Sequence, residues 1–562
     1  MKMTKTLEAS SCNRPDIDVD ADAASIEGTA VDVDKGQVAY EDKSVDPALR
    51  LTGGVVVEFT PEEEKSVLKN IDWHMLPLMC WVYMIQFADK TTLKYASLMG
   101  IQEDTKLVGN QYSWVSSIFY AGYLAWEFPT TYLFRRLPVG KYTAINIVCW
   151  GIALSCHAAT TNYAGLLAVR FLLGAFEATV TPAFVLITSM WFRQGEQGRR
   201  MGYWLSCNGV ALILMAFIGY GLSAITSAHL APWRILFLLL GLITVATGVV
   251  YFWFLPDNQT NANFLNEREK LIAVERIRDN FQGIGSQVWK WSQFREAFCD
   301  PRTYLYVLFS ALMNIPNGGI TTFGSLVVKS FGFDDRTALL LDGPSGAFDI
   351  AGKLLFTYFS DKLLDRTSMA FVAILIAMIG SILMIVVPQD IKPVLLIGYY
   401  MISVAGASWG LVMTAISNNT LGYTKKVTVN GLQILAYAAG NWIGPQTFRA
   451  DDAPEYRRGK TLVAIMYGLA AGVLVVIRLV NMRENKRRDR VQAEEGVDLQ
   501  DEGVRAEIER RKFMDLTDFE QPHFRYIFVG DPSDLRGRVL LVIAALSQVQ
   551  QAANDRTTQR GQ

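Results

Sequence analysis

The sequence predicts an all-α integral membrane protein with twelve transmembrane helices in two bundles of six. Of its 562 residues, 51% are hydrophobic and 19% are charged, whereas soluble proteins usually carry about 25% charged residues. Twelve apolar stretches are long enough to cross a bilayer, for which about 20 residues suffice. A charged stretch, residues 257–300, separates the first six from the last six.

The first half of the chain begins with a polar tail and continues with six apolar stretches. Residues 1 to about 60 contain few large apolar side chains, which predicts a disordered tail. Pro61 and the three glutamates after it favour a helix start. The sixth stretch has an uncharged core from Ile235 to Pro256. The six expected spans are residues 72–95, 111–134, 142–159, 164–191, 201–224 and 234–256.

The second half repeats this organisation after a polar loop. Within the loop, Asn266 to Asn280 has a helical, charge-rich pattern and is expected to form a surface helix. Six spans plus six, divided by one long loop, are typical of a duplicated transporter. The later spans are expected at residues 302–328, 337–359, 369–387, 394–418, 427–448 and 461–480. The resulting domains are a disordered tail (1–65), an N-terminal bundle (66–256), a central loop (257–300), a C-terminal bundle (301–482) and a C-terminal tail (483–562). Residues 491–562 of this second tail are expected to be mostly unfolded.

The distribution of basic residues predicts that both termini lie in the cytoplasm. Loops after the second and fourth spans are rich in Arg and Lys, and loops after the first, third and fifth are poor in them. The loop before the last span is an exception, but first helices usually dominate orientation. The N-terminus has no apolar segment of signal-peptide type. The basic run from Arg483 to Arg490 suits anionic lipid headgroups or a simple stop-transfer anchor.

The sequence contains no features of a nucleic-acid-binding protein, a metalloprotein, an ATP-driven transporter or an enzyme. A net charge of −1 gives no indication of a nucleic-acid partner. The six cysteines and four histidines have no metal-binding spacing, so neither a metal nor another cofactor is expected. The sequence contains no phosphate-binding loop and no nucleophile elbow, so we expect neither ATP-driven transport nor an enzyme.

Two charged residues in the fourth span are the strongest candidates for a functional site. Arg170 and Glu177 stand seven residues apart on one face of a helix. Each charge would cost roughly 2.5–3.5 kcal/mol in lipid, so both should face the bundle interior. Gly174 and Ala178 would allow a neighbouring helix to approach closely. The alternative is an Arg–Glu pair that only joins two helices.

Asp89 and Lys90 add a second charged pair at the end of the first span. Carrying an organic anion with protons requires a fixed cation and a carboxylate that titrates near the working pH. Arg170 is the first choice for the cation and Lys90 the second, while Asp89 and Glu177 are the candidates for proton coupling. The alternative places Asp89 and Lys90 at a helix end near the surface.

The second half offers amide side chains and a proline. Pro316, followed by Asn317 and two glycines, is typical of a broken transporter helix, or of a simple kink. Asn317 and Asn441 can hydrogen-bond substrate oxygens. Glu127 in the second span is expected to act as a gate or as a packing partner.

These motifs as a set resemble the major facilitator superfamily and, within it, the fungal anion:cation symporters of the allantoate permease type. The matching residues extend over about residues 66–526. They include Asp89-Lys90, Trp126-Glu127-Phe-Pro129, Arg170-Phe with Glu177, Asn441-Trp-Ile-Gly-Pro445 and, in the C-terminal tail, the stretch from Phe513 to Glu520.

The resemblance implies proton-linked uptake of small organic anions such as vitamins, ureides and other carboxylates. It also implies that Lys90 and Arg170 serve the substrate anion, with Glu177 as the following acidic residue. The superfamily's loop signature is degenerate after the second span. After the eighth it retains Asp361 but has Thr357 where glycine is usual.

We therefore expect a monomeric secondary transporter, in the plasma membrane, that imports a small organic anion by proton symport with alternating access. Allantoate, nicotinate and pantothenate are examples of such anions. The alternatives are an efflux antiporter for toxins or drugs and a nutrient receptor that does not transport. The expected partners are the organic anion, protons and the lipid bilayer.

Overall fold

The computed structural model describes residues 59–134, 136–225, 229–282, 289–362, 366–494 and 516–526. The regular elements in these residues are all helices, which confirms the all-α prediction. The expected disorder of residues 1–58 and 527–562 concerns chain outside the described residues.

Each expected span of the first half corresponds to a helix, and the fourth is divided in two. A break after Glu177 separates α6 from α7. The helices are α2 (Pro61–Leu98), α4 (Gln111–Leu133), α5 (Val139–Cys156), α6 (Tyr163–Glu177), α7 (Val180–Trp191), α8 (Gln194–Leu222) and α9 (Pro232–Phe254).

The second half has the same organisation, and its eighth and tenth spans are each divided in two. The expected surface helix of the central loop is confirmed as α10 (Glu267–Gln282), and a shorter helix, α11 (Trp291–Cys299), follows it. The remaining helices are α12 (Pro301–Lys329), α13 (Asp335–Leu341), α14 (Pro344–Lys362), α15 (Arg366–Val386), α16 (Lys392–Ile402), α17 (Ala405–Asn419), α18 (Tyr423–Ile443) and α19 (Arg457–Glu494).

By length and composition, seven helical segments of the described chain could cross a membrane. The other expected spans coincide with α2, α4, α12, α14 and α18, which carry more polar side chains. Buried Asp89 in α2 and buried Asp349 in α14 illustrate why their hydropathy is lower. Intramembrane ionisable residues face the bundle interior because lipid cannot solvate them. The five helices with weaker apolar character are therefore candidates for the interior of the bundle.

The first helix begins as its sequence predicts. Thr60 caps α2, with its hydroxyl accepting a hydrogen bond from the Glu63 amide, while the Glu63 carboxylate accepts one from the Thr60 amide. This reciprocal capping box satisfies two backbone donors that a helix start leaves free. Arg276 of α10 is fully buried and pairs with Glu64 of α2 and Glu196 of α8. These ion pairs attach the surface helix to the first half.

Close contact between α4 and α6 depends on glycine. A Cβ atom on Gly174 of α6 would collide with the carbonyl oxygen of Phe119 in α4, and one on Gly122 would collide with that of Phe171. The expectation that Gly174 allows close helix approach is confirmed. This approach brings Phe119 and Tyr120 next to the helix that carries Arg170.

Replacing Gly174 with alanine should therefore destabilise the first half. Overpacking a tight contact costs about 1–3 kcal/mol, because the backbones must move apart. The matched control is Gly410→Ala, where the new methyl group would enter open space. Thermal unfolding of the purified protein should show a lower midpoint for Gly174→Ala only; equal midpoints would contradict this packing.

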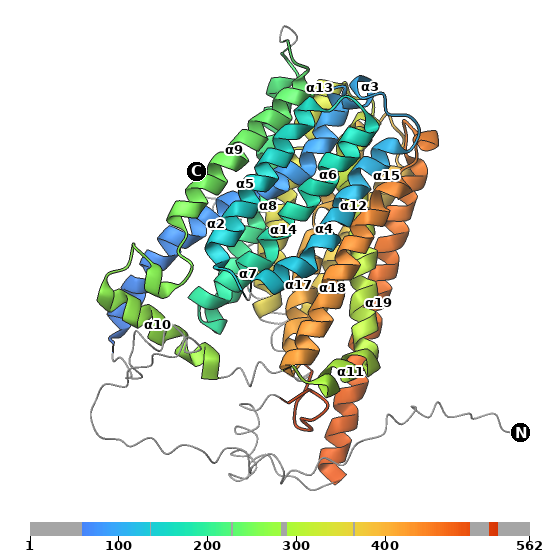
Figure 1. Ribbon diagram of the computed structural model, residues 1–562. Coiled ribbons are helices and arrows are strands. Elements are labelled where there is room, and N and C mark those ends of the chain that lie inside the picture. The colour runs from blue at the N-terminus through green and yellow to red at the C-terminus, as the bar shows by residue number, and fades with distance from the viewer. Residues whose placement is uncertain are drawn as a thin grey trace, which may run out of the picture. The chain divides into compact units, whose positions relative to one another are not determined.

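Hydrogen bonds join the two halves near one end of the bundle. The start of α2, α10, α11 and the end of α19 lie at one end, here called the near end, and α3 (Ile101–Asp104) and α13 lie at the other, the far end (Figure 1). Near the far end, the Ser116 and Thr322 hydroxyls are 2.6 Å apart, and Ser117 donates a 2.7 Å hydrogen bond to the Trp442 carbonyl. These contacts join α4 of the first half to α12 and α18 of the second.

A short part of the C-terminal tail, which was expected to be mostly unfolded, is ordered against the near end. Residues 516–526 pack on the second half, and Asp518 is fully buried there. Asp518 pairs with Arg302 at 2.7 Å and with Lys425 at 2.7 Å. We call these eleven residues the tail segment.

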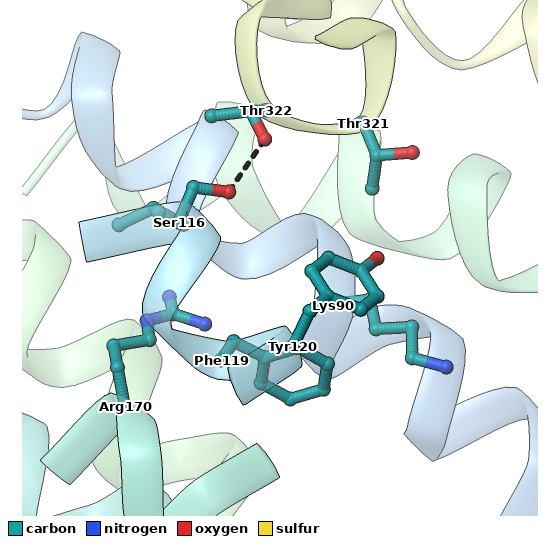
Figure 2. Close-up of a pocket in the computed structure, with 8 residues that line it drawn as sticks. Lys90, Ser116, Phe119, Tyr120, Arg170, Thr321 and Thr322 are labelled. Atoms are coloured by element: carbon teal, nitrogen blue, oxygen red, sulfur yellow. Dashed lines mark hydrogen bonds between the residues drawn. The ribbon is translucent and has the colours of Figure 1, made fainter. Parts of the chain in front are cut away.

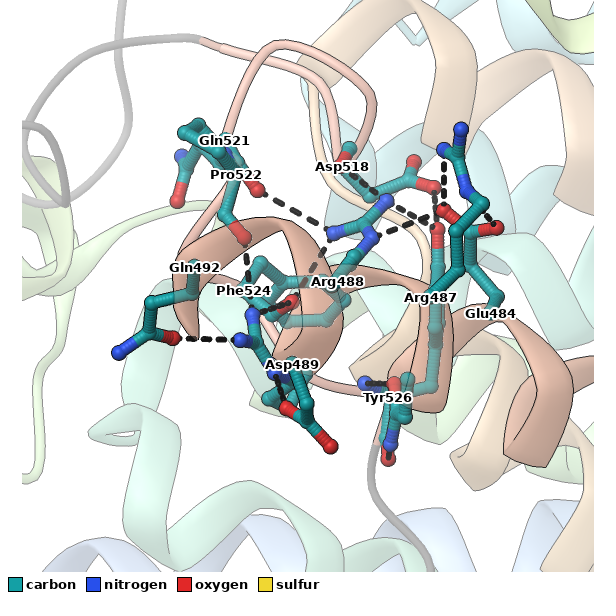
Figure 3. Close-up of polar contacts among 12 residues, drawn as sticks. Glu484, Arg487, Arg488, Asp489, Gln492, Asp518, Gln521, Pro522, Phe524 and Tyr526 are labelled. Carbon is teal, nitrogen blue, oxygen red and sulfur yellow. Dashed lines mark hydrogen bonds and ion pairs between the residues drawn. The ribbon is translucent and has the colours of Figure 1, made fainter. Parts of the chain in front are cut away.

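Arg488 holds the same segment from the end of α19. Its guanidinium group donates to the backbone carbonyls of Asp518, Gln521 and Phe524 and to the Tyr526 hydroxyl (Figure 3). The basic run in which it stands was expected to face lipid headgroups or to serve as a stop-transfer anchor. Arg488 is instead buried and binds the chain's own tail.

The charge state of the tail contacts predicts how they respond to acid. Burial alone would raise the pKa of Asp300, but hydrogen bonds from Arg302 and the charges of Arg302 and Lys425 lower it below its usual value. Its stabilising contribution is therefore present above the unfolded pKa of about 3.9 and is lost only as the pH falls through the lower folded value. Burial raises the pKa of Glu296 despite Lys425, so its contribution is greatest at low pH and falls as pH rises.

We expect the tail segment to stay docked at pH 5 and to detach only below about pH 4. Protease protection of residues 516–526 at pH 7, 5 and 3.5 measures this directly. Asp300→Asn should show a smaller loss of protection between pH 5 and pH 3.5 than the unmodified chain. Loss of protection already at pH 5 would contradict the sign of the Asp300 shift.

Candidate functional site

A cavity lies between the two halves and contains both predicted cations. Its walls come from α2, α4, α6 and α12, and its unfilled space, including space open to solvent, is about 320 Å³. Arg170 and Lys90 enter it from different helices, with the rings of Phe119 and Tyr120 between them in this view (Figure 2). The lining residues are Lys90, Leu93, Ser116, Phe119, Tyr120, Arg170, Thr321 and Thr322.

Arg170 is buried and forms no ion pair at contact distance with a described residue, although the charge of Asp89 lies near enough to act on it. Only 3% of the residue is exposed, and its Nε and Nη2 atoms make no hydrogen bond to any described residue. The guanidinium carbon lies 5.7 Å from the centre of the Phe237 ring. Unsatisfied buried donors on a charged group are energetically costly. The arrangement leaves a planar, bidentate donor available to an anion in the cavity.

Glu177 pairs with Lys90 rather than with Arg170. The Lys90 Nζ and Glu177 Oε1 atoms are 3.1 Å apart, and the Glu177 side chain is fully buried. The alternative in which Arg170 and Glu177 form a purely structural pair is therefore wrong. The pair instead joins α2 to α6 at the cavity, with a lysine that also lines it.

Asp89 lies inside the bundle and not at a surface helix end. The helix α2 continues beyond it to Leu98, and Asp89 is fully buried. One carboxylate oxygen accepts a 2.6 Å hydrogen bond from the Trp150 indole, and the other has no hydrogen-bond partner among the described residues. Asp89 and Lys90 point to different neighbours, as their adjacent positions on a helix require.

The predicted asparagines lie together, but not in this cavity. Asn317 donates a 2.9 Å hydrogen bond to Asn441, and Asn441 donates to Asn314 at 3.1 Å. The chain around Pro316 forms the unbroken helix α12, so the broken-helix expectation is wrong. Gly318 allows close contact with α18, since a Cβ atom there would lie 2.8 Å from the Asn441 Cα. A role for Asn317 and Asn441 in substrate binding stays a prediction.

The remaining predicted residues lie apart from the cavity lining. Glu127 of α4 is 7% exposed, and its Oε2 atom has no hydrogen-bond partner among the described residues. Asp361 falls in the last turn of α14, where its side chain is outside the described part of the chain.

Sequence reasoning missed the hydroxyl-bearing lining of the cavity. Ser116, Thr321 and Thr322 are small and occur in apolar helices without any motif that marks them. Their role depends on the close approach of α4 and α12, which residue spacing along one chain does not reveal.

Comparison with known proteins adds to this geometry. The model of the Major Facilitator Superfamily matches residues 79–445. The chain is 40% identical to allantoate permease of Saccharomyces cerevisiae over 87% of its own length and 92% of that protein. It is 34% identical to the thiamine pathway transporter THI73 of the same yeast, over 90% of this chain and 97% of the relative.

An uncharacterised transporter of Schizosaccharomyces pombe, C417.10, is 39% identical over 88% of this chain and 96% of its own. A solved bacterial homolog of the human lysosomal transporter Spinster has a similar fold. The TM-score is 0.55 at 14% identity, over 75% of this chain and 98% of that one.

Proposed function

Because the chain belongs to the Major Facilitator Superfamily, a family of membrane transporters, we propose that it imports a small organic anion together with protons. It is a multi-pass membrane transporter for a small molecule, and not an enzyme. The proposal extends this to the charge of the substrate, the coupling ion and the direction of transport.

The unpaired Arg170 is the observation on which the proposal rests. A buried guanidinium group that lines a cavity and forms no contact ion pair with a carboxylate of the described chain is suited to bind a carboxylate from outside the chain. Lys90 contributes a second positive charge on the same cavity. The hydroxyls of Ser116, Thr321 and Thr322 would orient other polar atoms of the substrate.

Proton coupling would arise because the substrate and Glu177 both interact with Lys90. When a substrate carboxylate enters beside Arg170 and Lys90, it competes with Glu177 for the lysine. Two neighbouring carboxylates repel, so a proton on Glu177 makes anion binding more favourable. Asp89, with one free carboxylate oxygen, is the second candidate for this role. The substrate and the proton would thus enter and leave together.

Alternating access would expose this site to each side of the membrane in turn. The hydrogen bonds between the halves near the far end would have to break for the site to open there. With both termini in the cytoplasm, the far end faces the outside of the cell. The proposal is that a monomer in the plasma membrane carries out this cycle.

The names of the relatives suggest which small organic anions to test first. Allantoate is a ureide carrying a carboxylate, which the pairing of Arg170 with nearby hydroxyls suits. We propose allantoate and related ureides first, then vitamin carboxylates such as nicotinate and pantothenate.

The test is uptake of labelled anions by cells that express the protein, at pH 5 and pH 7. Faster uptake at pH 5 of at least one anion supports proton-coupled import. Extrusion of a preloaded compound would favour the efflux alternative. Signalling without flux, with the protein present at the cell surface, would favour a receptor.

Glu177→Gln should separate exchange from accumulation. The variant retains side-chain volume but cannot release a proton, so exchange of labelled for unlabelled substrate should persist. Proton-driven accumulation should be lost, because an amide at this position cannot carry a proton with the substrate. Exchange and net uptake are measured in the same cells. An equal loss of both would show that Glu177 does not carry the coupled proton.

A further inference from the structure

The wall of the cavity between Arg170 and Lys90 is aromatic. Phe119 and Tyr120, which are neighbours on α4, both line the cavity, and only 4% and 5% of these residues are exposed. Their rings meet edge to face, with the ring centres 5.0 Å apart and the ring planes at 83°. The two rings lie between the cations in Figure 2, so an anion that contacts Arg170 and extends toward Lys90 would pass over them.

Aromatic rings of the second half hold Tyr120 in place. Tyr437 of α18 packs edge to face against Tyr120, with the ring centres 6.4 Å apart, and contacts Tyr123 of α4 at the same distance. Trp409 of α17 packs on Tyr437 in turn, with 5.8 Å between the ring centres. Neither Tyr437 nor Trp409 is among the described residues that line the cavity. Tyr437 is therefore a positioning residue for the Tyr120 ring.

The hydroxyl groups of the cavity already donate hydrogen bonds within the chain. Thr321 donates to the Asn317 carbonyl at 2.6 Å, and Thr322 donates to the Gly318 carbonyl at 2.8 Å. Ser116 is therefore the donor in its 2.6 Å hydrogen bond with Thr322. These hydroxyls can accept hydrogen bonds from a substrate but have no proton left to donate. Apart from the two cations, the cavity thus offers a substrate ring surface and hydrogen-bond acceptors.

We propose that Phe119 and Tyr120 form a stacking platform that selects anions whose carboxylate is attached to a planar, delocalised group. The inference rests on the proposed anion transport and names the class of anion. With its carboxylate on Arg170, a planar group lies against the Tyr120 ring in an offset or edge-to-face arrangement. Such aromatic pairs add affinity beyond the apolar area that they bury, and a saturated ring of the same size does not gain this contribution. Heteroaromatic carboxylates and ureides both carry a planar group.

The experiment compares the binding of benzoate and cyclohexanecarboxylate. Each probe has one carboxylate on a six-membered ring, and only the ring of benzoate is planar. Isothermal titration calorimetry measures both dissociation constants for the purified full-length protein in detergent at pH 7, where both probes are ionised. Arg170→Ala identifies binding outside the cavity, because it removes the guanidinium group that would hold either carboxylate.

The unmodified protein should bind benzoate about threefold or more tightly than cyclohexanecarboxylate. Tyr120→Leu should weaken the binding of benzoate and make the two dissociation constants similar. Tyr120→Phe retains the ring and should retain the preference. The matched control is Tyr203→Leu, which removes an exposed ring of α8 away from the cavity lining and should bind both probes as the unmodified protein does.

The positioning role of Tyr437 has its own readout. Tyr437→Leu should reduce the preference for benzoate without weakening the binding of cyclohexanecarboxylate, because only a planar group depends on the orientation of the Tyr120 ring. Tyr437→Phe keeps the ring contact and should restore the preference. A purely structural role would instead weaken the binding of both probes equally.

Equal binding of the two probes by the unmodified protein, or no binding of either, would overturn the platform. A preference that persists in Tyr120→Leu or in Arg170→Ala would also overturn it. If Tyr120→Leu does not fold, the preference of the unmodified protein and its loss in Tyr437→Leu provide the test. No proton gradient is present in this assay. A preference for benzoate without proton-driven uptake would contradict only the proposed function, and proton-driven uptake with equal binding of the probes would contradict only the platform.

Discussion

Replacing Arg170 with alanine should abolish substrate uptake while the protein still folds and reaches the membrane. The guanidinium group makes no hydrogen bond through its Nε and Nη2 atoms, so its removal breaks no hydrogen bond at those two atoms. A hydrogen bond to a charged group contributes about 1.5–3 kcal/mol, and losing two would raise KM by roughly 100-fold or more. Initial rates over a wide substrate range measure this.

Two further variants test whether the effect of Arg170→Ala is due to the guanidinium group at this position. Arg170→Lys keeps the charge but loses the bidentate fork, so it should retain weak uptake with a raised KM. Arg199→Ala removes an exposed arginine of α8 and should transport normally. Full uptake by Arg170→Ala would return this residue to a structural role and would leave the cavity without its main anion-binding group.

Replacing Asp518 with alanine should cause the largest loss of stability of any single change in the tail. The carboxylate is fully buried and contacts Arg302, Lys425 and the Tyr526 hydroxyl. Removing one member of a buried charge network costs about 3–5 kcal/mol, because the remaining charges lose their compensation. Thermal unfolding in detergent should show a midpoint several degrees lower, together with protease cleavage of residues 516–526.

Asp489→Ala is the matched control for Asp518. Asp489 pairs with Arg525 at 2.7 Å in the same region, but its side chain is 64% exposed. Exposed ion pairs contribute about 0–1 kcal/mol, so this variant should unfold close to the unmodified protein. Equal midpoints for the two variants would mean that the tail segment does not stabilise the second half.

The fold and the identity of the charged site residues could be predicted because lipid imposes strong rules on sequence. A charge inside an apolar stretch is expensive, which singled out Arg170, Glu177, Asp89 and Lys90. The pairing of Glu177 with Lys90 could not be predicted, since it depends on how α2 and α6 cross. Helix register and crossing angle follow from packing between distant segments.

The tail segment shows a second limit of sequence reasoning. Its polar composition indicates disorder, yet Asp518 is buried because Arg302, Lys425 and Arg488 converge on it from three different helices. The 2.6 Å ion pair between Lys94 and Asp342 was missed for the same reason, because the two residues are far apart in sequence. In both cases the charged side chains find their partners only in the folded chain.

The most direct test of proton-coupled anion import is transport by the purified protein in lipid vesicles. The substrate is the labelled anion that cells expressing the protein take up fastest. An inward proton gradient is imposed without any substrate gradient. The account predicts that labelled anion accumulates above its outside concentration, that accumulation collapses when a protonophore is added, and that Arg170→Ala vesicles show none. Equilibration without accumulation, or accumulation unaffected by the protonophore, would contradict proton-coupled anion import.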